Sequence, residues 1–354
     1  MDPRSSSRGL TAASAAIICL THATAAWSQQ WAPPPGDDSQ GIAAISWLLG
    51  ETDRAGTPVE PPRDAILAAG SETGGALSST IFQFTSSPIF VDPGRVWNAD
   101  DWCLQILPDG LIYPSYLAGV RESRFASVWM HERDQGWIWD IALGGRVGIA
   151  RWGTAGGGGV RPEGWQVDIE GAGMPRLDLE NDRDLLAVDF RFGIPLTYGR
   201  GPYQTKFAYY HLSSHMGDER MVRNNSLFRV NYVRDVLVWG HSYYPTEDVR
   251  IYGEVGWGFY VLDGAKPWEF QFGLDYSPAG PSERHGAPFF AVNAHLREEV
   301  DYSGSMVVQT GWQWRGLSDH LFRVGMEYFN GMSEQYEFFN EHEEKVGLGV
   351  WYDY

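Results

Sequence analysis

The sequence has almost no cysteine, no apolar run of membrane-helix length, and too little basic charge to balance its acidic charge. Its 354 residues include only two cysteines, and cleavage after Ala25 would leave Cys103 alone, which excludes an intramolecular disulfide. We expect Cys103 to be a small buried apolar residue. A spanning helix needs about 20 apolar residues, so a helical membrane protein is excluded. The formal net charge of -18 argues against nucleic-acid binding, which needs a basic face.

The first 80 residues are predicted to lie outside the folded domain. Arg4 and Arg8 precede a short apolar run, Leu10 to Leu20, and Ala23-Thr24-Ala25 has the small-x-small pattern of a cleavage site. Residues 1–25 are therefore predicted to be a secretory signal peptide. Residues 26–80 are rich in Pro, Gly, Ser and Asp and are predicted to be a disordered linker.

Aromatic residues and glycine are abundant: 16 Trp, 17 Tyr, 17 Phe and 42 Gly. From about residue 122 onward, apolar residues alternate with polar residues or glycine, as in Leu186, Val188, Phe190, Phe192 and Ile194. This period of two is typical of β-strands. About twelve such segments start near residues 124, 137, 164, 184, 203, 226, 248, 268, 287, 304, 320 and 344. They predict an all-β, antiparallel transmembrane β-barrel in residues 81–354, with an irregular segment at its N-terminal side.

The two strand faces predict where lipid lies. One face is too bulky and apolar for the core of a small barrel, whereas the other carries charges of both signs, as expected for a lumen that pairs internally. The predicted lumen charges are Arg146, Asp189, Arg191, Arg229, Glu254, Glu269, Asp275, Arg297, Arg323 and Glu327. Trp and Tyr near segment ends fit interfacial girdles, for example at Trp137, Trp152, Trp268, Tyr276 and Tyr328. A soluble sandwich or lipocalin-like barrel is the alternative fold.

The last segment alternates from Val346 to Tyr354. It resembles the C-terminal signature by which outer-membrane barrels are recognised for insertion, although the usual last residue is Phe or Trp. The resemblance implies a bacterial outer-membrane location, with membrane lipid and the barrel-assembly machinery as partners.

One short motif has the residue types for chemistry. His211 and Ser213 lie two apart in Tyr209-Tyr210-His211-Leu212-Ser213-Ser214-His215, so they share one face of a strand about 7 Å apart. Their parity is that of Phe207, which places a base and a nucleophile on the predicted lipid side. The alternative is that both residues belong to an aromatic girdle or a loop base and do no chemistry.

The motif resembles the outer-membrane phospholipase A and lipid A deacylase families, barrels with a His-x-Ser pair on an outward strand face. In them an Asn or Glu fourteen residues after the His lies on the next strand and orients the imidazole. The spacing selects Asn225, whose parity on an unbroken strand is inward, whereas Asn224 has the outward parity and the wrong spacing. The resemblance implies that His211 deprotonates Ser213 for attack on an acyl ester, with the Ser214 backbone N–H as a candidate oxyanion donor.

The phospholipase also uses Ca²⁺. Asp218, Glu219 and the stretch Glu180-Asn181-Asp182 are candidate ligands, and solvated loop carboxylates are the alternative.

A longer resemblance covers the chain after about residue 105. Leu107-Pro108-Asp109-Gly110, Tyr116-Leu117-Ala118, the 210–215 motif and the tail 335–354 are similar to a bacterial family of predicted barrels, domain of unknown function 1207. This family implies no established activity.

Three function classes therefore remain open. The first is a lipid acyl-ester hydrolase at the outer leaflet, with His211, Ser213 and Asn225 as its candidate residues. The second is a non-catalytic structural or interaction barrel. The third is a small-solute channel, and the mixed charges of the lumen argue against an open pore.

Overall fold

A computed structural model describes residues 101–354 except 158, 224, 226–228 and 283. The predicted signal peptide at 1–25 and linker at 26–80 lie outside the described residues and stay predictions. The described elements are β1 (Cys103–Ile106), β2 (Phe125–Glu132), β3 (Gly136–Gly153), β4 (Gly164–Asp178), β5 (Asp184–Arg200), β6 (Tyr203–Met216), α4 (Asp218–Arg223), β7 (Val233–Tyr243), β8 (Val249–Leu262), β9 (Trp268–Tyr276), β10 (Ala287–Arg297), η1 (Glu298–Val300), β11 (Gly304–Arg315), β12 (Leu321–Met332), η2 (Tyr336–Phe338) and β13 (His342–Asp353).

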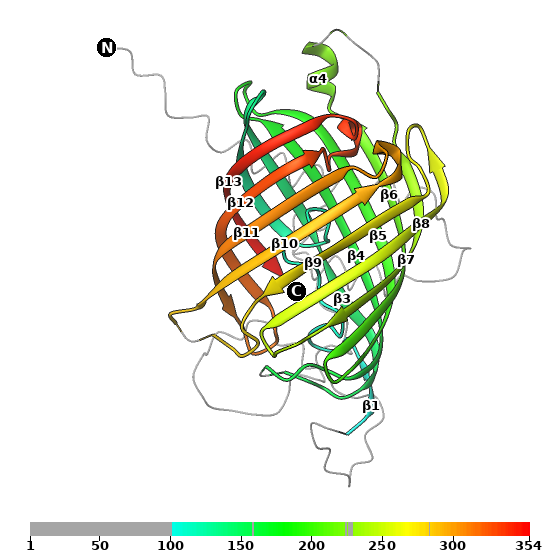
Figure 1. Ribbon diagram of the computed structural model, residues 1–354, viewed down its shortest axis with the longest axis vertical. Coiled ribbons are helices and arrows are strands. Elements are labelled where there is room, and N and C mark those ends of the chain that lie inside the picture. Colours follow the sequence, from blue (N-terminus) through cyan, green and yellow to red (C-terminus); the bar gives the residue numbers. More distant parts are fainter. Residues whose placement is uncertain (1–100, 158, 224, 226–228, 283) are drawn as a thin grey trace, which may run out of the picture. The chain divides into compact units, whose positions relative to one another are not determined.

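In the described part of the chain, twelve strands form a closed antiparallel barrel, as the alternation predicts (Figure 1). Each strand from β2 to β13 pairs with its neighbours in sequence, and β13 pairs with β2 to close the ring. Closure pairs the backbone groups that an open sheet would leave at its edges. We call the end that carries α4 the α4 end and the other the distal end.

One strand starts later than predicted. β7 begins at Val233 rather than near residue 226, because α4 and the connection after it occupy that part of the chain. The prediction that Arg229 lines the lumen is therefore wrong, since Arg229 lies in this connection and is exposed. Arg234, fully buried on β7, points into the lumen instead. Cys103 is also half-buried on β1 rather than buried.

The apolar face of the strands points outward. On β5, Phe190, Phe192 and Ile194 are 43–49 % exposed, whereas Asp189, next to Phe190 in the chain and on the opposite face of the strand, is fully buried. Trp137, Trp152 and Trp268, predicted as girdle residues, are among the exposed aromatics. An apolar exterior around a charged interior is the pattern of a transmembrane barrel and the reverse of a soluble one. No helix in the described ranges is long and apolar enough to cross a membrane.

The lumen is filled with paired charges. Buried arginines and lysines from neighbouring strands contact buried carboxylates, which offsets the cost of removing each charge from water. The pairs include Arg146–Asp168 at 2.5 Å, Arg191–Glu170 at 3.1 Å, Lys206–Glu254 at 2.6 Å, Arg234–Glu269 at 3.1 Å and Arg323–Asp353 at 2.9 Å.

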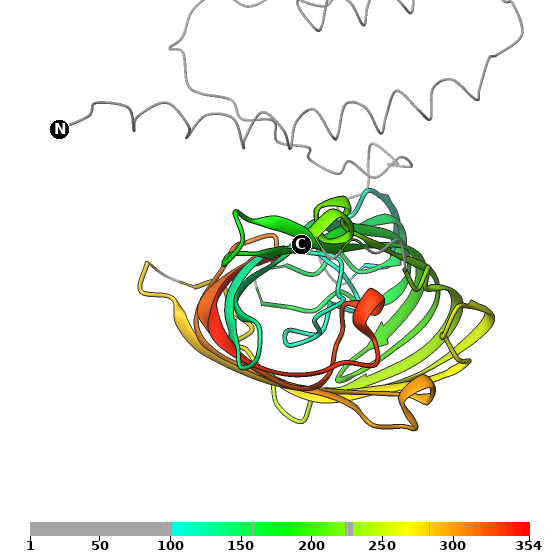
Figure 2. The ribbon, with the colours of Figure 1, turned by 90° about the horizontal axis from the view of Figure 1, so that it is seen from above.

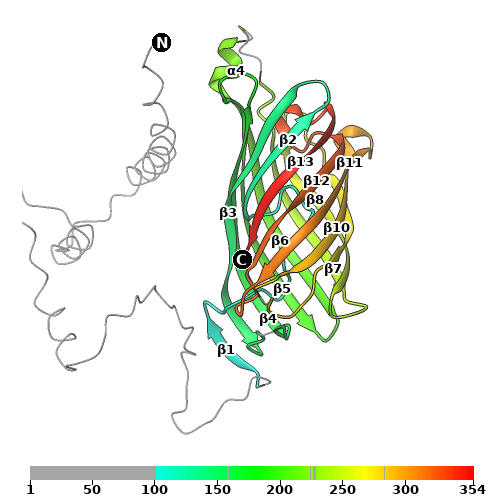
Figure 3. The same cartoon turned by 90° about the vertical axis from the view of Figure 1, so that its left-hand side faces the viewer.

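Residues 107–124 also occupy the lumen, and we call them the lumen segment. β1 and β2 both pair with β3 (Figure 3). β1 pairs with the distal end of β3, and β2 pairs with the α4 end of β3. The lumen segment connects β1 to β2. Seen from above, this part of the chain lies inside the ring (Figure 2). Tyr116 stacks on Tyr252 at 3.8 Å, and its hydroxyl donates to Glu254 at 2.6 Å. Gly110 has φ = +70°, a left-handed conformation that favours glycine at this turn.

We expect the barrel to conduct no ions. Three cavities between lumen residues measure about 120, 40 and 20 Å³, and the lumen segment contributes to the lining of each of them. Single-channel recording in planar bilayers, beside a conducting porin, tests this. Stepwise currents from folded protein would support the channel class.

Candidate functional site

The predicted His-x-Ser pair lies on the outer wall of the barrel near the α4 end. β6 ends at Met216, so Ser213 is three residues, or about 10 Å, from the end of the strand. His211 and Ser213 are both partly exposed, while Leu212 between them is fully buried toward the lumen. The structure thus confirms the outward parity of both residues.

Asp235 on β7 lies directly opposite His211 in the β6–β7 register. The distance from His211 Nδ1 to Asp235 Oδ1 is 2.9 Å, and the Tyr209 hydroxyl donates to the same oxygen at 2.8 Å. The side chains of His211 and Asp235 are 40 % and 20 % exposed. A carboxylate on an apolar outer wall is costly unless it has partners; Asp235 has two, and it is the third residue of β7, near the α4 end.

The wall around these side chains is apolar and locally irregular. Ser213 pairs with Phe190 on β5 and Val233 on β7, both outward-facing. The β7–β8 register shifts between Asp235 and Val236, where β8 has one extra residue, Phe259, as in a β-bulge. Bulges occur frequently next to active sites, where they redirect side chains.

Asn225 does not lie on the strand after His211. It follows α4 in the connection to β7, is exposed, and has φ = +45°. The position at His211 Nδ1, which the resemblance gives to Asn225, is occupied by Asp235, 24 residues after the histidine. Asn224, the alternative, lies outside the described residues.

The backbone N–H of Ser214 is not free to act as an oxyanion donor. It donates to the carbonyl of Tyr232 at 2.9 Å as part of the sheet. The Ser214 side chain points inward and donates to Asp189. The prediction for the Ser214 N–H is therefore wrong in this conformation.

Comparison with known proteins places this barrel in a family. The model of the family described as "Protein of unknown function (DUF1207)" matches residues 103–354. The chain belongs to this family. The match includes the lumen segment, and its buried Tyr116–Ala118 motif is part of the interior of the DUF1207 barrel.

Solved structures similar to the DUF1207 barrel are outer-membrane proteins of low sequence identity. The outer membrane phospholipase (OMPLA) dimer with bound calcium from Salmonella typhi has 11 % identity and a TM-score of 0.45, covering 68 % of this chain and 91 % of that chain. Outer membrane phospholipase A from Escherichia coli has 10 % identity and a TM-score of 0.45, covering 68 % of this chain and 90 % of that chain. The KdgM porin has 11 % identity and a TM-score of 0.37, covering 65 % of this chain and 99 % of that chain. No curated protein matches the chain in sequence.

Two of the candidate Ca²⁺ ligands, Glu180 and Asn181, bond to protein groups in the DUF1207 barrel. Among the described residues, no group of three or more His, Cys, Asp or Glu side chains is arranged to hold a metal ion. Glu180 accepts from the backbone N–H of Trp137 at 3.1 Å, and Asn181 donates to Asp178 at 2.9 Å.

Chemically, the outward cluster combines a hydroxyl, an imidazole and a carboxylate. A carboxylate that accepts from Nδ1–H fixes the tautomer in which Nε2 is unprotonated and available as a base. No hydrogen bond joins His211 to Ser213 in the described structure, and such bonds often form only when substrate is bound.

Proposed function

We propose that this DUF1207 barrel is a bacterial outer-membrane protein that hydrolyses acyl esters of lipid at its outer wall. The observation that carries the proposal is the His211–Asp235 contact beside Ser213, on a surface that faces lipid. An outward serine and an anchored histidine are accessible to a substrate within the membrane, whereas water-soluble substrates would meet them only at the interface.

In this mechanism Ser213 Oγ attacks the acyl carbonyl carbon while His211 Nε2 takes its proton. The tetrahedral intermediate collapses, the ester C–O bond breaks, and His211 returns the proton to the leaving alcohol oxygen. Water, deprotonated by His211, then attacks the acyl-serine ester; the bond from Ser213 Oγ to the acyl carbon breaks, His211 returns the proton to Ser213 Oγ, and the fatty acid is released. Asp235 holds the imidazole and stabilises its positive charge during both steps.

The membrane orientation supports a substrate in the outer leaflet. Bacterial barrels place their C-terminus on the periplasmic side, and counting hairpins from β13 puts the α4 end outside the cell. Ser213 then lies about 10 Å below that end. We also propose that β13, which pairs with β2 and β12, is the strand recognised by the assembly machinery.

The second candidate function is a non-catalytic structural or interaction barrel. The buried ion pairs and the lumen segment favour it, because they fill and stabilise the barrel. A purely structural protein requires these features and requires no catalytic site. Activity measurements separate the two.

The test is acyl-ester hydrolysis by purified, detergent-folded protein on phospholipid and on lipid A, each with and without Ca²⁺. We expect fatty-acid release by the unmodified protein and its loss in Ser213→Ala and His211→Ala. Ser127→Ala and His241→Ala are matched controls, since both residues also lie on the outer wall. Absence of activity on either lipid, or activity that survives both changes, supports the structural barrel instead.

A further inference from the structure

A hollow of about 430 Å³ opens on the outer wall of the barrel over β3, β4 and β5, and we call it the outer-wall hollow. One row of directly opposed residues crosses it from strand to strand. The row consists of His211 on β6, Phe192 on β5, Gly171 on β4 and Gly145 on β3. A Cβ atom at Gly145 would lie 2.7 Å from Cε2 of Tyr354, the residue that follows β13. The outer-wall hollow therefore begins beside the histidine of the candidate site and ends at Tyr354.

Two glycines on the outward face make this hollow. Successive side chains on a strand point to opposite faces, and at Gly145 and Gly171 the outward residue has no side chain. The next outward residues, Val147 and Ile169, are 48 % and 38 % exposed and form apolar walls. A Cβ atom at Gly171 would meet one atom within 4 Å, the Arg191 carbonyl oxygen at 3.6 Å, so the floor of the hollow is open. Glycine inside a strand weakens it and often marks a place where a ligand approaches the backbone closely.

The path from Ser213 into the outer-wall hollow crosses β5 between two aromatic rings. Phe190 lies directly opposite Ser213, and Phe192, two residues further along β5, lies opposite His211. The Phe190 ring leans toward β4, because its Cε1 atom would lie 3.4 Å from a Cβ atom at Gly173. An acyl group on Ser213 Oγ thus has an aromatic side chain on each side of its way to β4.

The length and slope of this path fit a long acyl chain. β6 and β3 are three strand spacings apart, about 14 Å, which an extended chain of about twelve carbon atoms covers. The strands of such barrels are tilted by about 35–45°, so a row across them runs obliquely through the membrane. The C-terminus, at the far end of the row, lies between the two ends of the barrel (Figure 3), whereas Ser213 is near the α4 end. A chain in the hollow therefore runs from the interface toward the bilayer centre, as the acyl chain of a membrane lipid does.

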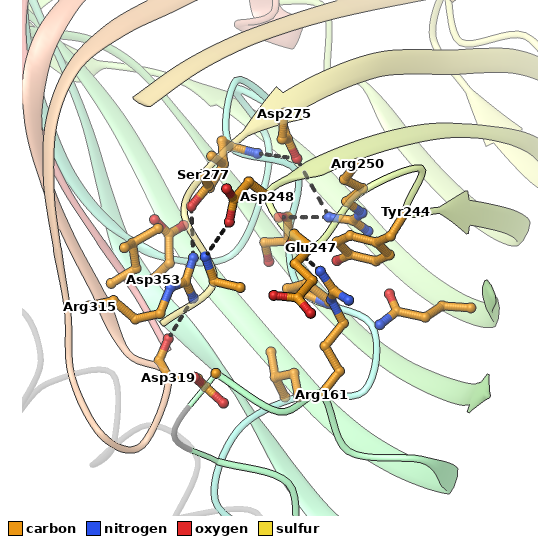
Figure 4. Close-up of a pocket in the computed structure, with 18 of the residues that line it drawn as sticks. Arg161, Tyr244, Glu247, Asp248, Arg250, Asp275, Ser277, Arg315, Asp319 and Asp353 are labelled. Atoms are coloured by element: carbon orange, nitrogen blue, oxygen red, sulfur yellow. Dashed lines mark hydrogen bonds and ion pairs between the residues drawn. The ribbon is translucent and has the colours of Figure 1, made fainter. Parts of the chain in front are cut away.

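The distal cavity of the lumen is less suited to such a chain. It measures about 120 Å³. Polar contacts join residues of its lining, among them Arg250 with Asp275 and Arg315 with Ser277 (Figure 4). The outer-wall hollow is larger, and the side chains on its outward face are apolar or aromatic.

We propose that the outer-wall hollow binds the acyl chain of the ester that Ser213 attacks and thereby selects esters of long-chain fatty acids. This inference rests on the proposed function, since it places the ester carbonyl at Ser213. Gly171 is the specificity-determining residue, because a side chain there stands in the path of the chain, two strand spacings or about 10 Å from β6.

Gly171→Leu fills the outer-wall hollow and tests the proposal. Hydrolysis of dihexanoyl and dimyristoyl phospholipid is measured in the same mixed micelles. A hexanoyl chain ends before β4, whereas a myristoyl chain extends past it. We expect the variant to lower the ratio of kcat/KM for the myristoyl ester to that for the hexanoyl ester at least about tenfold, because a chain stopped at β4 displaces its carbonyl from Ser213.

Gly253→Leu is the matched control. Gly253 on β8 is also a half-buried outward glycine, and a Cβ atom there would meet no atom closer than 3.8 Å. Neither Gly171 nor Gly253 has a positive φ, so leucine fits the backbone at both positions. The control variant is expected to keep the ratio of the unmodified protein.

A second measurement needs no turnover. Myristic acid that carries a diazirine near its methyl end is bound to the detergent-folded full chain and photolysed, and the adducts are mapped by peptide mass spectrometry. We expect the strongest labelling on β3 and β4 around Val147 and Ile169, with a severalfold loss in Gly171→Leu and none in Gly253→Leu.

The two measurements separate this inference from the proposed function. If Ser213-dependent hydrolysis occurs and Gly171→Leu leaves the ratio unchanged, the outer-wall hollow does not select the acyl chain, while the hydrolase stands. If neither ester is hydrolysed, the proposed function fails and the photolabel decides alone. Equal labelling of Gly171→Leu and the unmodified protein then overturns the acyl-chain site, and labelling lost only in Gly171→Leu supports it.

Discussion

Replacing Asp235 by alanine is expected to lower kcat for acyl-ester hydrolysis by about a thousandfold and to leave KM nearly unchanged. The reason is that Asp235 Oδ1, 2.9 Å from His211 Nδ1, selects the tautomer that can deprotonate Ser213. Without it the imidazole rotates freely and either nitrogen carries the proton. Initial rates of fatty-acid release over a range of lipid mole fractions in mixed micelles give kcat and KM separately.

Two further variants distinguish positioning from a merely structural role. Asp235→Asn retains an oxygen that can accept from Nδ1–H, and the resembling families place Asn or Glu at this position, so we expect it to recover part of the lost kcat. Tyr209→Phe removes only the second donor to Asp235 and is expected to cost less than about tenfold. If Asp235→Ala is as active as the unmodified protein, Asp235 does not position His211 and the catalytic assignment loses its main support.

Replacing Arg176 by methionine is expected to destabilise the barrel by about 3–5 kcal/mol. Arg176 on β4 is 2 % exposed and bonds two carboxylates, Asp140 on β3 at 2.6 Å and Glu343 on β13 at 2.5 Å. Methionine fills similar space but leaves both carboxylates with Lys345 as their one ion-pair partner among the described residues. Urea unfolding of the protein in vesicles, followed by tryptophan fluorescence, measures the loss.

The matched control for this prediction is Arg133→Met. Arg133 also forms an ion pair with a carboxylate, Glu344, but its side chain is 73 % exposed at the α4 end. Exposed pairs contribute about 0–1 kcal/mol, so this variant is expected to unfold close to the unmodified protein. Equal stability of the two variants would contradict the view that the lumen charges hold the barrel closed.

The strands were predictable because alternation is a local property that each strand carries in its own sequence. β4, β5, β6, β9, β10 and β11 begin at the predicted residues. The pattern failed at β7, where apolar residues such as Val230 and Tyr232 continue the alternation backward from Val233. Tyr232 instead contacts Tyr336 and Phe339 of the β12–β13 connection, and Val230 packs against the same cluster, which local sequence does not reveal.

That error also hid the partner of His211. Once β7 begins at Val233, Asp235 shares the outward parity of Leu237 and Trp239, and a carboxylate on an apolar face is a visible signal. The register that places Asp235 opposite His211 could not be read from spacing alone, because a connection of 16 residues separates β6 from β7. The lumen segment was unpredictable for a related reason: it has no period of its own and is held by contacts with distant strands, such as Arg323 on the Leu117 carbonyl.

Labelling with a lipid-like fluorophosphonate tests the central claim most directly, because this reagent forms a covalent adduct only with an activated serine. We predict one adduct on the folded protein in detergent, mapped by peptide mass spectrometry to Ser213, and its loss in His211→Ala. Folded protein that forms no adduct, or an adduct on another residue that persists in Ser213→Ala, would contradict the hydrolase account.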